Sequence, residues 1–152
     1  MDTCQIRKVR YFWEDLFMIK VIYGAKGAGK TKLMIESANE AVKTAKGHLI
    51  FITDSKRGMY DLEREVRFID VSEYNVAGEV ALCGFIKGVI AGNNDNEYVF
   101  IDGVVRIAGK PVAEMPEFFY MLDKVAEKND ITITVSVSAT KEELPDFVTK
   151  YL

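Results

Sequence analysis

The sequence Ile19-Lys-Val-Ile-Tyr-Gly24-Ala-Lys-Gly-Ala-Gly-Lys-Thr31 decides the fold that we expect for this chain. It begins with a mostly apolar run typical of a buried strand, and residues 30–46 have the periodicity of an amphipathic helix. The stretch from Gly24 to Thr31 fits the phosphate-binding pattern G-x-x-x-x-G-K-S/T at every fixed position. Because that pattern needs a strand before it and a helix after it, the context favours a phosphate site over a chance glycine-rich turn.

The residues of this stretch have separate tasks in the expected site. Glycines permit positive φ, so backbone N–H groups can surround phosphate oxygens, and the positive end of the helix dipole points at the same place. We expect Lys30, as a solvent-facing loop lysine, to bind the β- and γ-phosphates, and Thr31 to bind a Mg²⁺ ion that bridges them. The predicted phosphate-binding residues are Gly24, Ala25, Lys26, Gly27, Ala28, Gly29, Lys30 and Thr31.

A carboxylate supplies the second chemical signal. Tyr98-Val-Phe-Ile-Asp102 is an apolar strand that ends in an acid. In an open α/β sheet, ligands bind beyond the carboxyl ends of the strands, so Asp102 should lie beside the phosphate loop. We expect Asp102 to hold the same Mg²⁺ ion as Thr31, directly or through water.

Small hydroxyl residues supply the third signal. Residues 131–138, Ile-Thr-Ile-Thr-Val-Ser-Val-Ser, alternate strictly between apolar and polar side chains. Such alternation fits a half-exposed edge strand. If the strand instead lies between the other two motif strands, its hydroxyls approach the terminal phosphate. Ser138 therefore joins Lys30 and Asp102 as a candidate catalytic residue.

Length and charge limit the classes of function. A chain of 152 residues fits one domain. Its net charge of −3 and pI near 5.3 show no excess of basic residues of the kind that usually accompanies nucleic-acid binding, so such binding is not evident. No apolar run approaches the ~20 residues of a membrane-spanning helix. Cys4 and Cys83 lie far apart without metal-ligand spacing, so we expect a reduced, cytoplasmic protein without zinc.

The first 17 residues stand apart from the nucleotide-binding domain that we expect over residues 18–152. They predict a short amphipathic extension that packs on the domain or on a neighbouring copy, contacts a membrane surface, or is dispensable. Its apolar residues at roughly helical spacing are Ile6, Val9, Phe12, Trp13, Leu16 and Phe17.

The remaining segments alternate between strands and helices, which predicts an α/β three-layer sandwich with a mostly parallel central sheet of five or six strands. Gly47 is expected to end the helix over residues 30–46. In a later helix, Gly84 and Gly88 suggest that another backbone segment approaches closely. Strands are expected at 48–53, 66–70 (at the sheet edge) and through 147–152, and helices at 78–91 and 116–129.

Together, the Gly24–Thr31 stretch and the strands ending at Asp102 and near Ser138 resemble the P-loop NTPase superfamily. Within it, residues 18 to about 152 are similar to the RecA-like branch. This resemblance implies the strand order 5-1-4-3-2, with one strand between the two motif strands. The chain also looks like short bacterial ATP-binding proteins known as twitching-motility-type proteins. The pilus-retraction motors that share this label carry histidine boxes, whereas His48 is the only histidine here. The sequence therefore does not support a motor function.

The resemblance implies ATP and Mg²⁺ as cofactors, because no N-K-x-D guanine motif occurs. One position departs from it. Hydrolysing members commonly carry a water-activating glutamate just after the metal aspartate, but here Gly103 follows Asp102. Glu97, Glu114 and Glu117 are present, and the spacing assigns none of them to this role. Intrinsic hydrolysis is therefore expected to be slow or dependent on a partner.

Three functions remain open from the sequence. The first is an ATP-binding, Mg²⁺-dependent ATPase that is slow or stimulated by a protein partner or a second copy of the chain. The second is a small-molecule kinase in which Arg106 and Lys110 cover the phosphates or bind an acceptor. The third is a nucleotide-binding interaction module without turnover. Lys56, Arg57 and Arg64 are candidates for contacting the nucleotide or a partner.

Overall fold

The computed structural model describes residues 18–152, so the predicted extension over residues 1–17 lies outside the described part. The strands are β1 (Ile19–Gly24), β2 (His48–Thr53), β3 (Val66–Asp70), β4 (Asn96–Ile101) and β5 (Thr132–Ser138). The helices are α1 (Lys30–Val42), α2 (Glu79–Ala91), α3 (Val104–Ala108), α4 (Pro116–Asn129) and α5 (Asp146–Thr149). Short 3₁₀ turns join several of these elements.

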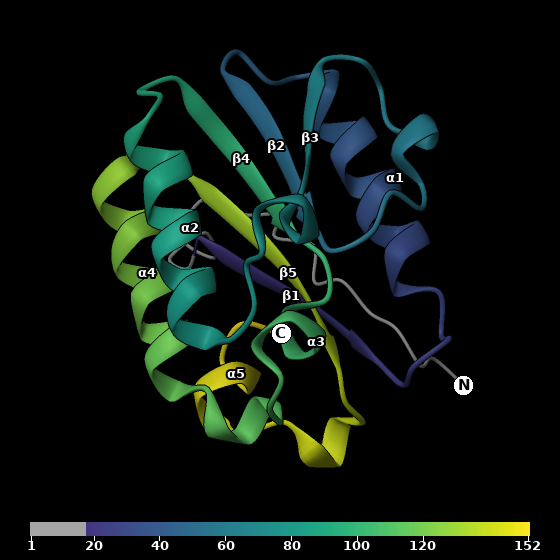
Figure 1. The fold of residues 1–152 in the computed structure, drawn as a ribbon, viewed down its shortest axis with the longest axis vertical. Coiled ribbons are helices and arrows are strands. Elements are labelled where there is room, and N and C mark those ends of the chain that lie inside the picture. Colours follow the sequence, from purple (N-terminus) through teal and green to yellow (C-terminus); the bar gives the residue numbers. More distant parts are fainter. Residues whose placement is uncertain (1–17) are drawn as a thin grey trace.

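The five strands form one parallel sheet in the order β1-β5-β4-β2-β3 (Figure 1). The sheet confirms the predicted α/β class and places Val66–Asp70 at an edge, as expected. Because β5 runs between β1 and β4, Gly24 lies in register with Ser138, and the end of β4 follows on the next strand. The carboxyl ends of all three strands that carry the sequence signals therefore meet at one edge of the sheet.

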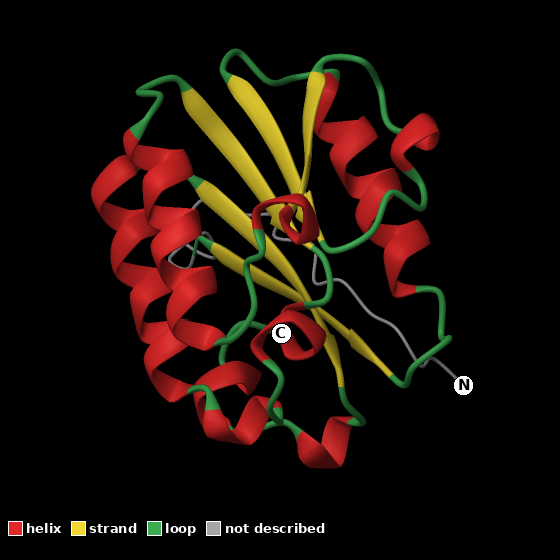
Figure 2. Cartoon of the chain, in the orientation of Figure 1, coloured by secondary structure: helices red, strands yellow, loops and turns green. Residues whose placement is uncertain are grey.

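Helices cover both faces of this sheet. Figure 2 shows α1 on one side and the neighbouring helices α2 and α4 on the other. Successive residues of a strand point to opposite faces, so Phe51 packs in the cluster under α1, whereas Ile52 packs in the cluster under α2 and α4. The arrangement is a three-layer sandwich whose two apolar cores hold the sheet edge in place.

The position of β5 between β1 and β4 decides between the two structures that its alternating sequence allows, an edge strand and a central strand. Ile133, Val135 and Val137 belong to the core on the α2 and α4 side, so the hydroxyl residues between them face the α1 layer. Thr134 and Ser136 are buried there, with exposed fractions of 3% and 1%. The half-exposed edge strand is therefore the wrong alternative, because small hydroxyl groups are covered by a helix instead of by water.

Helix α1 ends earlier than the sequence predicts. Its last residue is Val42, and Gly47 is not its C′ stop. Gly47 instead leads into β2, where its N–H donates to Glu97 Oε1 over 2.7 Å. A Cβ atom at Gly47 would collide with the Asp95 carbonyl oxygen, so the glycine is needed for close packing against the turn before β4.

The predicted last strand through 147–152 is also wrong. Residues 146–149 form α5, and Val148 and Tyr151 are buried against the α4 side of the molecule. These two residues are three apart, which fits helical spacing and not the two-residue period of a strand. Within residues 18–152, β1 consequently has β5 as its sole neighbour, and the outer strand implied by the resemblance is not found.

The two glycines of α2 face open space. A Cβ atom added to Gly84 or Gly88 meets nothing within 4 Å, so the predicted close backbone approach at these glycines is wrong.

The sequence did not predict α3, the five-residue helix that follows Gly103. No helix between residues 18 and 152 has the length and apolar character needed to cross a membrane.

Candidate functional site

The Gly24–Thr31 stretch runs from the last residue of β1 through a loop, residues 25–29, into the first turn of α1, and this loop contains two left-handed residues. Gly27 has φ +83° and Gly29 has φ +91°, a region that residues with side chains rarely adopt. An added Cβ atom at either position meets nothing within 4 Å, so both residues face open space. The loop therefore leaves room for a ligand to approach its backbone, as its sequence predicts for a phosphate site.

Lys30 is the first residue of α1, and only 9% of it is exposed. Its Nζ atom donates a hydrogen bond to the carbonyl oxygen of Ala25 over 3.0 Å. The expectation of a solvent-facing loop lysine is wrong, because the helix starts directly after Gly29 and the side chain folds back over the loop. Lys30 thus ties the loop to the helix and holds its ammonium group at the inner wall of the site.

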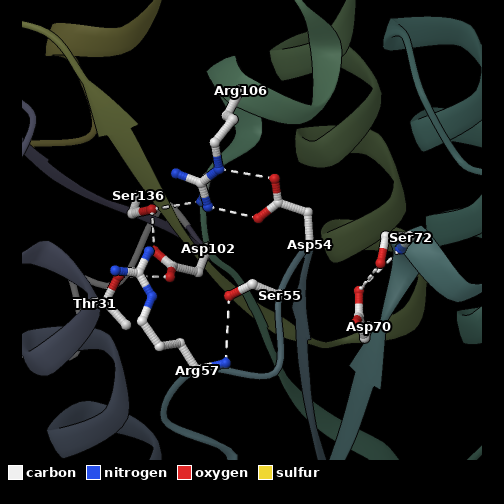
Figure 3. Close-up of polar contacts among 10 residues, drawn as sticks. Thr31, Asp54, Ser55, Arg57, Asp70, Ser72, Asp102, Arg106 and Ser136 are labelled. Carbon is white, nitrogen blue, oxygen red and sulfur yellow. Dashed lines mark hydrogen bonds and ion pairs between the residues drawn. The ribbon is translucent and has the colours of Figure 1, made fainter.

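Asp102 connects α1, β4 and β5 at the end of the sheet. The Thr31 hydroxyl donates to Asp102 Oδ2 over 2.8 Å, and the Ser136 hydroxyl donates to Oδ1 over 2.6 Å (Figure 3). Ser136 Oγ in turn accepts the N–H of Gly103 over 2.8 Å. Asp102 is 4% exposed, and hydrogen bonds to both of its carboxylate oxygens compensate for the burial of this group. The two predicted metal ligands, Thr31 and Asp102, are therefore in direct contact.

A cavity of about 820 Å³ opens in front of this network. We name two parts of its lining by the elements that form them. The inner part comprises the glycine loop, the first turn of α1, the end of β5 and the residues that follow β4, namely Lys26, Gly27, Gly29, Lys30, Thr31, Lys32, Asp102, Gly103, Arg106, Ser136 and Ser138. The outer part comprises the middle of α1 and the loop after β2, namely Ile35, Glu36, Asn39, Arg57, Gly58 and Asp61. Ser138 thus lies on the wall that also carries the loop glycines and the buried carboxylate. The structure brings the three candidate catalytic residues to one cavity.

The outer part of the cavity lies between α1 and the loop after β2. Asn39 on α1 donates to the Asp61 carbonyl oxygen over 2.8 Å and accepts the N–H of Glu63 over 2.8 Å. Gly58 has φ +82°, and a Cβ atom there would collide with Ile35. Close packing and two hydrogen bonds thus fix this loop on the helix, so the cavity has a defined outer wall.

An arginine–carboxylate pair stands at the same edge of the sheet. Arg106 donates from Nε to Asp54 Oδ2 over 2.8 Å and from Nη2 to Oδ1 over 2.6 Å (Figure 3). These bonds lower the pKa of the Asp54 carboxyl and raise the pKa of Arg106, while partial burial acts in the opposite direction on each. The pair is a bidentate contact of the geometry that guanidinium groups form with carboxylates and phosphates.

Several candidates from the sequence lie elsewhere. Lys56 pairs with Glu73, and Lys110 pairs with Glu79. Glu97 accepts the N–H groups of Lys46 and Gly47 at the opposite end of the sheet. The lining of the cavity does not include Arg64, Glu114 or Glu117.

Sequence reasoning missed the roles of Ser136 and Asp54. Ser136 was one of four alternating hydroxyl residues, and only the strand order shows that it contacts the carboxylate of Asp102. Asp54 follows directly after β2, just as Asp102 follows β4, and that position was the available signal. Glu36, on the exposed side of α1, gave no signal of its own.

No protein-family model matches the chain, and no curated protein matches it either. The geometry of the site is therefore the basis for inferring the function.

Proposed function

We propose that the protein binds ATP together with Mg²⁺ and hydrolyses it slowly, or faster when a partner completes the site. The observation that carries this proposal is the contact between the Thr31 hydroxyl and the buried Asp102 carboxylate, beside a loop with two left-handed glycines. A phosphate chain needs backbone N–H groups, a cation and a metal ligand set, and these residues supply each of them.

The donor set at the inner wall fits magnesium. Mg²⁺ prefers oxygen ligands and is usually bound through one or two protein groups, with waters and phosphate oxygens as its other ligands. Thr31 Oγ1 and Asp102 Oδ2 would hold the ion, whose charge neutralises the phosphate oxygens when it is bound. Ser136 keeps the carboxylate oriented, because its hydroxyl donates to the other oxygen of Asp102.

Lys30 and the loop act on the phosphate chain itself. The Lys30 ammonium group, which now donates to the Ala25 carbonyl oxygen, would exchange this neutral acceptor for charged phosphate oxygens. The first N–H groups of α1 have no intrahelical partner and add the positive end of the helix dipole. No large movement of the backbone is needed for this exchange, because Gly27 and Gly29 already have left-handed conformations.

The carboxylates near the site support slow or assisted hydrolysis. Besides Asp102, the acidic residues that line the cavity are Glu36 and Asp61, both on its outer part. An additional protein, or a second copy of this chain, is therefore proposed to orient the attacking water. A cytoplasmic location, where ATP and reduced thiols such as Cys83 occur together, belongs to the same proposal.

The size of the cavity supports a second candidate, a small-molecule kinase. Beyond the loop glycines, the cavity continues along α1 to Arg57 and Asp61, which leaves space beside a phosphate chain for an acceptor molecule.

A nucleotide-binding interaction module without turnover is the third candidate. It is supported by the position of the other acidic residues of the lining, because Glu36 and Asp61 are exposed and lie on the outer part of the cavity, away from Asp102.

Phosphate release from Mg²⁺-ATP by the purified chain, alone and with a panel of small hydroxyl and phosphate acceptors, tests these candidates. The proposed ATPase predicts slow release of inorganic phosphate that does not depend on an acceptor. Transfer of the phosphate to an acceptor supports the kinase instead, and tight ATP binding without any product supports the interaction module. Failure to bind ATP at all would contradict the proposal.

A further inference from the structure

Arg106 is a cationic residue of the cavity lining that has no role in the proposed Mg²⁺-ATP site. It lies in α3, the helix that follows Asp102 and Gly103, and it lines the cavity together with Lys30 and Ser138. Half of its side chain is exposed (51%), although the guanidinium group makes two hydrogen bonds to Asp54. Its cationic head is thus ordered and reachable from the cavity.

The backbone at Gly103 brings this guanidinium group close to the metal-ligand carboxylate. Gly103 has φ +85°, and a Cβ atom there would overlap the Arg106 guanidinium atoms. The absence of a side chain therefore lets the cation lie against the chain one residue after Asp102. The Asp102 charge contributes to the raised pKa of Arg106, after the larger effect of Asp54, so the two groups interact electrostatically.

We propose that Arg106 forms a subsite for the terminal phosphate of a nucleoside triphosphate, and that it leaves Asp54 to bind this phosphate. The proposal rests on the proposed ATP site and adds a means of distinguishing a triphosphate from a diphosphate. Asp54 holds the arginine through a bidentate contact. A terminal phosphate presents the same paired oxygens with more negative charge than one carboxylate, so it competes for the same donors.

Asp54 retains a cationic neighbour after this exchange. Arg57, three residues further along the chain, also lowers the pKa of Asp54 through its charge. In the view of Figure 3 the Arg57 side chain extends from the loop towards Thr31 and Asp102, and all three residues line the same cavity. Because Arg57 and Arg106 both line the cavity, the negative charge of Asp54 does not become isolated when Arg106 moves.

A diphosphate cannot make the exchange, because it lacks the group that competes with Asp54. Binding of ADP would therefore leave the Asp54–Arg106 pair intact, whereas binding of ATP would replace it. The part of the difference in affinity between ATP and ADP that is lost when Arg106 is replaced measures this subsite.

The test is a calorimetric comparison of Mg²⁺-ATP and Mg²⁺-ADP binding to the full chain and to four variants, with circular dichroism as the check on folding. Arg106→Ala should lose about tenfold in ATP affinity while ADP affinity stays the same. Arg106→Lys should recover only part of the loss, because an ammonium group cannot form the bidentate contact. Asp54→Asn should raise ATP affinity, because the arginine is no longer held. Arg67→Ala, an exposed position on β3 outside the cavity lining, should behave as the wild type.

Two outcomes would overturn the subsite. If Arg106→Ala is folded and lowers ATP and ADP affinity equally, or lowers neither, Arg106 does not recognise the terminal phosphate, and the proposed ATP site is unaffected. If the wild-type chain binds neither nucleotide, the proposed function and the subsite are both wrong. A loss restricted to ATP, recovered in part by lysine, is the result that supports it.

Discussion

Thr31 and Asp102 are 71 positions apart in the chain and are joined by a hydrogen bond of 2.8 Å. The contact unites the start of α1 with the residue after β4, although β5 separates β4 from the strand that leads into α1. It is formed because all five strands are parallel and end at one edge of the sheet. A hydroxyl and a carboxylate at this separation can share one hard cation, which is the basis of the proposed Mg²⁺ site.

Asp102→Asn should weaken ATP binding in the presence of Mg²⁺ more than in its absence. The amide of asparagine can still accept a hydrogen bond from the Ser136 hydroxyl, but it has no negative charge to bind the Mg²⁺ ion. We expect the gain in ATP affinity on adding Mg²⁺ to fall by about tenfold or more, measured by titration with Mg²⁺ and with EDTA. Equal losses under both conditions would identify Asp102 as a purely structural residue.

Ser136→Ala and Ser138→Ala should separate stability from function. Removing the Ser136 hydroxyl takes one donor from the buried Asp102 carboxylate and leaves the Gly103 N–H without its acceptor. We expect the free energy of unfolding in urea to fall by about 2–4 kcal/mol. Ser138→Ala, at a half-buried position on the cavity wall, should change it by less than about 0.5 kcal/mol but slow ATP turnover. Equal stability losses in the two variants would contradict this division.

Gly84→Ala should stabilise the protein. Gly84 is exposed within α2, and a Cβ atom there has open space. Because alanine restricts the unfolded chain and favours a helix, we expect the free energy of unfolding to rise by about 0.5–1 kcal/mol. The control is Gly103→Ala, which should destabilise the protein because that residue has φ +85° and adjoins Arg106. A destabilised Gly84→Ala variant would indicate a packing partner for this face of α2.

Alkaline pH should weaken the fold through Tyr151. Burial raises the pKa of this phenol to about 12 from its ordinary value near 10. The folded state thus holds the proton more tightly than the unfolded state, so the stabilisation is complete below pH 10 and is lost as the pH rises from 10 to 12. Urea unfolding between pH 9 and pH 12 should show this decline, and Tyr151→Phe should reduce it. An identical decline in that variant would assign it to other groups.

The sequence predicted the positions of most residues of the candidate site because its signals were local. The glycine loop, the strand ending at Asp102 and the helix after Gly29 each depend on neighbouring residues, and their positions agree with the expectation. The burial of Lys30 and the contact between Ser136 and Asp102 depend on the strand order and on the start of α1, which no short segment encodes. These features were therefore missed.

Two errors in the fold have the same origin. Residues 146–149 were expected to form part of a strand, but the buried pair Val148 and Tyr151 needs helical spacing to reach the core on the α4 side. Gly47 was expected to end a helix, whereas its lack of a side chain serves the close approach of the turn at Asp95. In both cases a tertiary contact, absent from the local pattern, decided the conformation.

The most direct measurement is a calorimetric titration of Mg²⁺-ATP into the wild-type chain, Lys30→Ala and Lys43→Ala. Lys43 serves as the control, because it lies just beyond the other end of α1 with an exposed side chain. Lys30→Ala should remain folded with a loss of about 1–3 kcal/mol from the hydrogen bond to Ala25. The proposed site predicts that Lys30→Ala loses detectable ATP binding while Lys43→Ala retains it. Wild-type ATP affinity in a folded Lys30→Ala variant would contradict the proposed site.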